Sequence, residues 1–165
     1  MTTKATRAVP EGYHTVTPTL TLDNCAQAIE WYKVALGAEE IGRAAGDDGK
    51  ILHADLRIGN SHVMMNDPMM GAKGPLASGG SPVSLWVYVE DCDAVFNRAV
   101  SAGAKVLPGM GKMQDQFWGD RSGSFTDPHG YKWTIATHKE DVAPDEMRRR
   151  QDDWVKKQTL QPAHS

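Results

Sequence analysis

Hydrophobic and polar residues alternate along Lys50–Asp67, KILHADLRIGNSHVMMND, and the alternation is interrupted only at Gly59-Asn60. Alternation with a period of two predicts β-strands, because successive side chains of a strand point to opposite faces. A Gly-Asn pair between two such runs is typical of a two-residue hairpin turn. The pattern therefore predicts a hairpin made of strands 51–58 and 61–67.

The turn also sets the register of this hairpin. It places Arg57 opposite His62, and it places Asp55 opposite Met64. Asp55 and His62 are then diagonal neighbours on one face, and their side chains could converge. The apolar face can pack under a helix, whereas the polar face must meet water or line a cavity. The polar face carries His53, Asp55, Arg57, His62, Met64 and Asn66.

Two stretches of the chain, Thr17–Ala38 and Ser84–Ala104, follow the same order of elements. Each has a short strand, an acidic capping segment, an amphipathic helix that starts near a cysteine, and a closing glycine. Strand-like pieces follow each helix, so we expect an α+β fold built from two β-α-β-β-β modules. The expected strands are 39–43, 51–58 and 61–67 in the first module, and 105–107, 118–126 and 131–137 in the second.

The segments outside the modules differ in composition. The segment after the second module, APDEMRRRQDDWVKK, predicts a C-terminal helix with Pro144 at its first position. We expect this helix to cover part of the body formed by the two modules. The more specific alternative is that it lies at a dimer interface. The domain boundaries are then an N-terminal arm at 1–12, the first module at 13–67, a Gly/Pro linker at 68–82, the second module at 83–138, and the C-terminal helix and tail at 139–165.

Composition narrows the function classes. The 165 residues carry a net charge of −3, which argues against non-specific binding to nucleic acid and against an anionic membrane surface. The apolar runs are strand-sized and the first residues lack an apolar core, so we expect a cytoplasmic protein with no membrane span.

The two cysteines, Cys25 and Cys92, fall at equivalent helix starts in different modules. A disulfide is not expected in a reducing compartment, and two cysteines do not make a four-ligand zinc site. Each cysteine is either a thiol with its pKa lowered by the helix end or a small buried residue.

Several motifs together resemble the vicinal oxygen chelate superfamily, the glyoxalase, bleomycin resistance protein and extradiol dioxygenase group. These are AIEWYKVALGAE, TDPHGYKW and the duplicated module pattern, while HADLRIGNSHVMMND and FWGDRSGSFTDPHGYKW resemble its PhnB-like branch. The resemblance implies that the two modules pair into a curved sheet or half-barrel that encloses a cavity, often in a homodimer. In the glyoxalase and dioxygenase members that cavity holds a divalent metal.

The resemblance also identifies the positions where such a metal would be held. They fall on Thr17, Met64, Ser84 and Thr134, none of which is a good ligand for a hard or borderline cation. His53 and His62 are separated by on the order of 13 Å along the hairpin, too far to share one ion. We therefore predict no metal and no other cofactor.

The cavity can instead hold a small molecule. If Ser84 faces inward, alternation turns Trp86 and Tyr88 inward as well, and Trp118 lies where a cavity strand begins. Arg57 and Arg121 could hold a carboxylate or phosphate, although Arg121 could also form a structural ion pair with Asp120. The predicted ligand-binding residues are Arg57, His62, Met64, Asn66, Ser84, Trp86, Tyr88, Trp118, Arg121 and Thr134.

Three functions follow from these observations. The first is a metal-independent protein that binds a small aromatic or amphipathic molecule, as a homodimer. The second is an enzyme of the same superfamily, a lyase, isomerase or dioxygenase-like protein, with His53 and Asp55 as catalytic residues or with an unconventional metal site. The third is a non-catalytic interaction subunit. The sequence does not decide whether the protein is an enzyme.

Overall fold

The computed structural model describes residues 4–109 and 111–160, so the outermost residues of the predicted arm and tail lie outside the described chain. The first module forms a four-stranded sheet, sheet A, in the order β1-β4-β3-β2, with β1 parallel to β4. The predicted hairpin register is confirmed, with Arg57 opposite His62 and Asp55 opposite Met64. The elements are β1 Thr19–Thr21, α1 Cys25–Leu36, β2 Glu39–Ala45, β3 Ile51–Ile58 and β4 Ser61–Asn66.

The second module repeats this arrangement. Its sheet, sheet B, has the order β5-β9-β8-β6, with β5 parallel to β9 and with β7 paired to β8. The short strand β7 was not expected from the sequence, because it lies in a stretch without alternation. The elements are β5 Ser84–Tyr88, α3 Cys92–Ser101, β6 Lys105–Val106, β7 Gln114–Asp115, β8 Asp120–Thr126 and β9 Lys132–His138, and a one-turn helix α2, Pro75–Ser78, lies in the linker.

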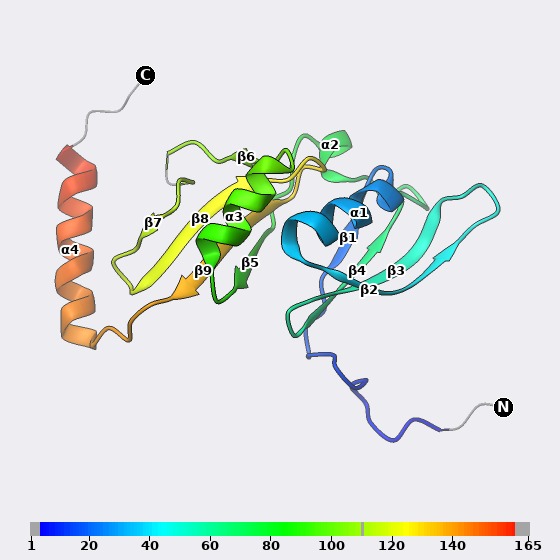
Figure 1. Cartoon of the computed structure of the whole chain (residues 1–165), viewed down its shortest axis with the longest axis horizontal. Helices are drawn as coiled ribbons and strands as arrows, with labels where there is room; N and C mark the ends of the chain where they lie inside the picture. Colours follow the sequence, from blue (N-terminus) through cyan, green and yellow to red (C-terminus); the bar gives the residue numbers. More distant parts are fainter. Residues whose placement is uncertain (1–3, 110, 161–165) are drawn as a thin grey trace.

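The two modules pack through their helical sides. Helices α1 and α3 lie side by side over the two sheets (Figure 1). The Trp31 indole donates to the carbonyl of Ala102 at 2.8 Å, and the Tyr32 hydroxyl donates to Asp127 at 2.6 Å. The core is therefore shared between the modules. Over the described residues the two sheets do not close into a barrel within one chain.

Each sheet consequently has an outer face, directed away from α1 and α3. We call the face with Asp55, His62 and Met64 the outer face of sheet A. The face with Trp86, Tyr88 and His138 is the outer face of sheet B. Both outer faces carry polar side chains that could contact a ligand.

The cysteines begin α1 and α3 as predicted, and both are buried and free. Burial, together with the nearby charge of Asp67, raises the pKa of the Cys25 thiol to about 12. A lowered pKa is therefore wrong for Cys25, because the loss of hydration outweighs the helix end.

This environment predicts an unreactive thiol. In a Cys92→Ser variant, native protein should show no reaction of Cys25 with Ellman's reagent at pH 8 over an hour. Full reaction is expected once urea exposes the thiol, which serves as the control. Rapid labelling of the native variant would contradict the assignment of Cys25 as a buried core residue.

The C-terminal helix α4 spans Pro144–Leu160, with Pro144 at its start as predicted. It lies at one end of the molecule beyond β7 (Figure 1). Its contacts with the body include the ring of Trp154 against Phe117, at 5.6 Å between centroids, and an ion pair between Arg150 and Glu140. Through these side chains the helix contacts part of the second module and the segment that follows it. No helix of the described chain is long and apolar enough to cross a membrane.

Candidate functional site

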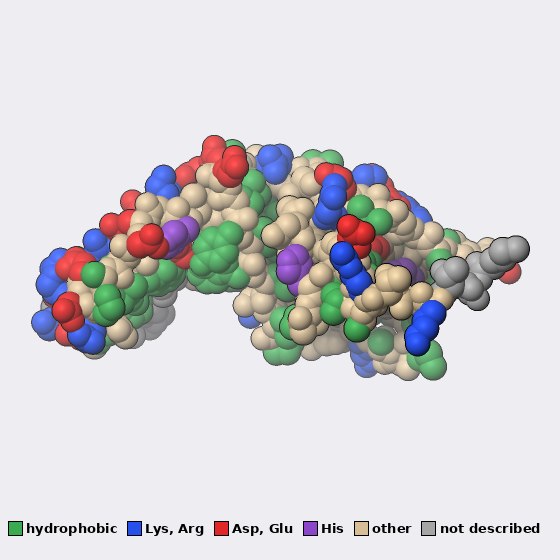
Figure 2. Space-filling view, turned by 90° about the horizontal axis from the view of Figure 1, so that it is seen from below, with side chains coloured by type: hydrophobic (Ala, Val, Ile, Leu, Met, Phe, Trp, Pro, Cys, Tyr) green, Lys and Arg blue, Asp and Glu red, His purple; other side chains and the backbone are tan. Residues whose placement is uncertain are grey.

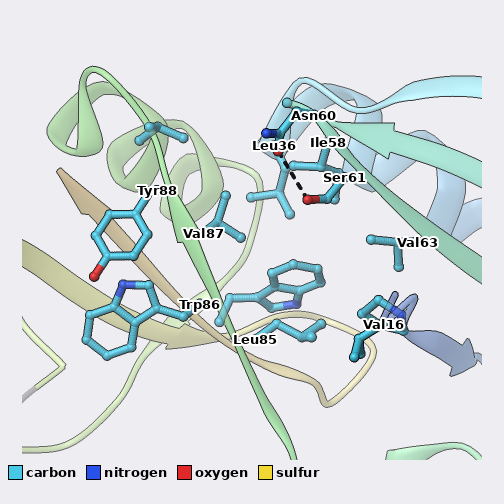
Figure 3. A pocket seen from close by; sticks show the side chains of 14 residues that line it. Val16, Leu36, Ile58, Asn60, Ser61, Val63, Leu85, Trp86, Val87 and Tyr88 are labelled. Atoms are coloured by element: carbon cyan, nitrogen blue, oxygen red, sulfur yellow. Dashed lines mark hydrogen bonds between the residues drawn. The ribbon is translucent and has the colours of Figure 1, made fainter. Parts of the chain in front are cut away.

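Three aromatic side chains gather on the outer face of sheet B. The ring of Trp86 lies 6.2 Å from that of Tyr88 and 6.4 Å from that of Trp118, measured between centroids. Trp86 is 48% exposed and Tyr88 is 61% exposed, which is high for large rings on a strand. Strand alternation explains the placement, because β5 directs Trp86 and Tyr88 to one side of the sheet and Leu85 and Val87 to the other (Figure 3).

A buried carboxylate holds two of these rings, Tyr88 and Trp118, in place. Asp120, at the start of β8, is only 3% exposed. Because an ionised carboxylate can only accept, the Tyr88 hydroxyl and the Trp118 indole must both donate to it, each at 2.9 Å. The Nδ1 atom of His138, opposite Asp120 on β9, is the third donor at 2.8 Å. The four residues form one network beneath the exposed aromatic surface.

The network shifts the titration of its members. Burial opposes ionisation of Asp120, but the hydrogen bonds from His138, Tyr88 and Trp118 outweigh it and hold the pKa of Asp120 below its ordinary value. The hydrogen bonds to Asp120 and Asp141 raise the pKa of His138. The contribution of His138 to stability is therefore complete below pH about 6.5 and is lost as the pH rises through its raised pKa. That of Asp120 is present above pH about 4 and is lost as the pH falls through its lowered pKa.

A titration followed by NMR tests this network. We expect the imidazole of His138 to titrate above pH 6.5, and we expect its pKa to fall in an Asp120→Asn variant, since the carboxylate that stabilises the imidazolium is gone. The resonances of His14, an exposed histidine of the N-terminal segment, serve as the internal control. An unchanged His138 titration in Asp120→Asn would refute the proposed pairing.

A cleft of about 590 Å³ adjoins this surface, and Trp86 and Tyr88 are among the residues that line it. One wall is β5, which forms the edge of sheet B, and the other is the β3–β4 turn with the segment before β1 (Figure 3). Its apolar lining includes Leu36, Ile58, Val63, Leu85 and Val87. Seen from below, the molecule is arched around a hollow on the side away from α1 and α3, between the α4 end and the first module (Figure 2).

The outer face of sheet A holds a second polar cluster. Asp55 is buried, and both of its oxygens lie 2.9 Å from Nδ1 of His62. Tyr13, from the segment before β1, stacks on the His62 ring with 4.0 Å between centroids and 19° between planes. The Tyr13 hydroxyl donates to Asp55. His62 and Asp55 thus converge as the hairpin register predicted, and the structure adds Tyr13.

Other predicted site residues have different neighbours. His53 is exposed, and the described chain provides no side-chain hydrogen bond to it, so the histidine beside Asp55 is His62. Arg57 pairs with Glu39 at the surface. The predicted Asp120–Arg121 ion pair is wrong, because neighbouring residues of a strand point to opposite faces. Arg121 pairs instead with Asp93, at 2.6 Å, and with Asp115, at 3.2 Å.

The four positions where the superfamily holds a metal do not fit one here. The Thr134 hydroxyl is hydrogen-bonded to Ser124 at 2.8 Å, and Met64 offers a thioether opposite Asp55. Ser84 is exposed at the start of β5, and Thr17 precedes β1. Within residues 4–109 and 111–160, no three His, Cys, Asp or Glu side chains come together in a group that could hold an ion.

Sequence reasoning missed three residues that the structure brings into these clusters, namely Asp120, His138 and Tyr13. A signal for His138 was present, because alternation from Thr134 places it on the same face of the last strand. Asp120 follows from pairing β8 with β9 in register, which required both strand ends to be known. No sequence pattern indicated Tyr13, since the segment before β1 has no periodic pattern.

Comparison with known proteins identifies the family of this chain. The model of the Glyoxalase/Bleomycin resistance protein/Dioxygenase superfamily matches residues 13–135, so the chain belongs to this superfamily. The protein Rv0887c of Mycobacterium tuberculosis is 42% identical over 138 residues, covering 81% of this chain and 79% of the relative. The predicted superfamily is confirmed.

Solved structures share the fold. The crystal structure of TioX from Micromonospora sp. ML1 is 27% identical with a TM-score of 0.59, covering 76% of this chain and 98% of TioX. A PhnB protein from Bacillus cereus has a TM-score of 0.56 at 19% identity, covering 75% of this chain and 99% of that protein. The predicted α+β fold with paired modules is thus confirmed, and a PhnB protein is among the structures that share it.

Proposed function

We propose that this protein is a metal-independent binding protein for a small aromatic or amphipathic molecule, which it holds against Trp86, Tyr88 and Trp118. The observation that carries the proposal is the exposure of Trp86 and Tyr88, with the half-buried Trp118 beside them, next to the buried Asp120. Hydrogen bonds fix Tyr88 and Trp118, so a ligand would lose little free energy in ordering them. Aromatic rings give large apolar contacts and retain polar atoms for orientation.

The same observation supports a homodimer. Small-molecule sites bury roughly 70–90% of the ligand surface, which an open sheet face cannot do. The molecule is arched around a hollow (Figure 2), and over residues 4–109 and 111–160 the two sheets do not close into a barrel. A second copy that places the outer face of its sheet A over sheet B would enclose the rings. Size-exclusion chromatography with light scattering should then give twice the 18.0 kDa of one chain.

An enzyme of the same superfamily has less support from the geometry. The predicted catalytic pair was His53 and Asp55, but His53 is exposed and Asp55 is occupied by His62 and Tyr13. None of the described residues occupies the aromatic surface over Asp120 in this way, so binding is the function we favour.

Quenching of tryptophan fluorescence tests the proposal. We expect a planar aromatic cation such as ethidium, or the amphipathic anion anilinonaphthalene sulfonate, to bind with a micromolar Kd that EDTA leaves unchanged. A Trp86→Ala variant should bind about tenfold more weakly, in keeping with about 1–1.5 kcal/mol for one aromatic contact. Leu76→Ala, which truncates another exposed apolar side chain, is the matched control. Equal affinity of Trp86→Ala and wild type, or binding that needs a metal, would refute the proposal.

A further inference from the structure

Asp55 and His62 are almost completely covered although they lie on the outer face of sheet A. Their side chains are 11% and 10% exposed, whereas His53 and Arg57 on the same hairpin are exposed. The cover comes from the segment before β1. The Tyr13 ring lies flat on the His62 imidazole. Gly12 lies against Nε2 of His62 so closely that a Cβ there would come within 3.2 Å.

The residues on either side of Tyr13 are held to the rest of the molecule at few points. Residues 4–12 and 14–16 are exposed. Within the described part of the segment before Pro18, the Tyr13 hydroxyl forms the only side-chain hydrogen bond to the body, the one to Asp55. The Tyr13 side chain is thus attached to the body at a single place, and the segment around it is exposed. The side chain could therefore leave the site without disturbing the core.

The site formed by Asp55 and His62 requires particular chemistry of its occupant. The Asp55 carboxylate can only accept, so Nδ1 of His62 must carry the proton that it shares with Asp55, and the hydroxyl above must be a donor. The His62 ring offers a flat aromatic surface at stacking distance. An occupant therefore needs a planar ring with a hydroxyl at its edge.

We propose that Asp55 and His62 form a binding site for phenolic small molecules, and that the Tyr13 side chain is an internal occupant of this site. A free phenol would stack on His62 and donate its hydroxyl to Asp55 in place of Tyr13. This site is on sheet A and stands apart from the aromatic surface over Asp120, so it does not rest on the function proposed above.

The tether explains how the site is regulated. A side chain attached by a short flexible segment competes with an effective concentration on the order of millimolar. Wild-type protein should therefore bind a free phenol only above that concentration. Removal of the Tyr13 ring leaves the site at Asp55 and His62 open to the phenol. Displacement of Tyr13 would also release the N-terminal segment from sheet A.

The test uses p-cresol, which is the tyrosine side chain without its backbone. In the full-length Tyr13→Ala variant, p-cresol should shift the imidazole resonances of His62 with a low-millimolar Kd and should raise Tm. Wild type should require roughly two- to severalfold more p-cresol, because the tethered ring adds its millimolar effective concentration to the apparent Kd. Toluene, which has the ring but lacks the hydroxyl, should bind Tyr13→Ala about tenfold more weakly than p-cresol. His14→Ala, an exposed neighbour in the same segment, is the matched control and should behave as wild type.

Two further variants test the role of Asp55 and separate this site from the surface over Asp120. Tyr13→Ala/Asp55→Asn, checked for folding by circular dichroism, should lose the preference for p-cresol over toluene. Tyr13→Ala/Trp86→Ala should retain p-cresol binding at His62, which separates this site from the surface over Asp120. A folded Tyr13→Ala protein whose His62 resonances do not respond to p-cresol would overturn the proposal. So would a response that Asp55→Asn leaves unchanged.

Discussion

Replacement of Asp127 by alanine should lower the free energy of unfolding by about 4 kcal/mol, since it removes the acceptor shared by four buried or partly buried donors. The carboxylate, 4% exposed, accepts the Tyr32 hydroxyl at 2.6 Å and the Trp133 indole at 2.8 Å. It also accepts the amides of His129 and Tyr131, each at 2.9 Å. Tyr32 belongs to the first module and the others to the second, so this one side chain joins the modules.

Urea denaturation measures the effect, followed by both fluorescence and circular dichroism. Tyr32→Phe is the matched comparison, because it removes one hydrogen bond and keeps the ring, and it should cost only about 1 kcal/mol. If the modules depend on each other through Asp127, the Asp127→Ala transition should also broaden. A loss below 1 kcal/mol would show that the cross-module network contributes little to stability.

Gly119→Ala should also be strongly destabilising, by about 3 kcal/mol, and should weaken ligand binding at the aromatic surface. Gly119 has φ +100°, and a Cβ there would overlap the backbone oxygen of Glu140 and lie 3.0 Å from Val142. The Gly119 carbonyl accepts the amides of Lys139 and Glu140 at 2.9 and 3.1 Å. Because Gly119 separates Trp118 from Asp120, a shift of this turn would misplace both.

Gly49→Ala is the control for this prediction. Gly49 also has a positive φ, +79°, but no atom lies within 4 Å of the Cβ it would gain. Its replacement should cost only the backbone strain, about 1 kcal/mol. Urea denaturation and fluorescence quenching of both variants would separate strain from overlap. Equal stability losses in the two variants would contradict the tight contact between Gly119 and Glu140.

The hairpin of β3 and β4 shows how far sequence reasoning extends. Its register follows from a two-residue turn and an alternating pattern, which are local properties, and the structure confirms it. The convergence of Asp55 and His62 followed from that register. The partner of Arg121 could not be predicted in the same way, because Asp93 lies on α3 and reaches Arg121 only once the helix packs on the sheet.

Tyr13 and Asp120 show the same limit at the two outer faces. Tyr13 comes from a segment without periodicity, so only its docked position reveals that it covers His62. Asp120 was considered as the ion-pair partner of its neighbour Arg121. The structure shows instead that it accepts from Tyr88, Trp118 and His138, which come from three different segments. Such clusters depend on contacts between distant parts of the chain.

The sequence by itself determined the duplicated modules, the helix starts at Cys25 and Cys92, the hairpin register and the superfamily. These depend on periodicity, capping and turn residues, whose physical effects act over a few residues. Only the tertiary structure decided that the modules pack through α1 and α3 and leave both outer faces open. It also decided which donors surround each buried carboxylate, because burial and hydrogen bonding are set by the packing of the whole chain.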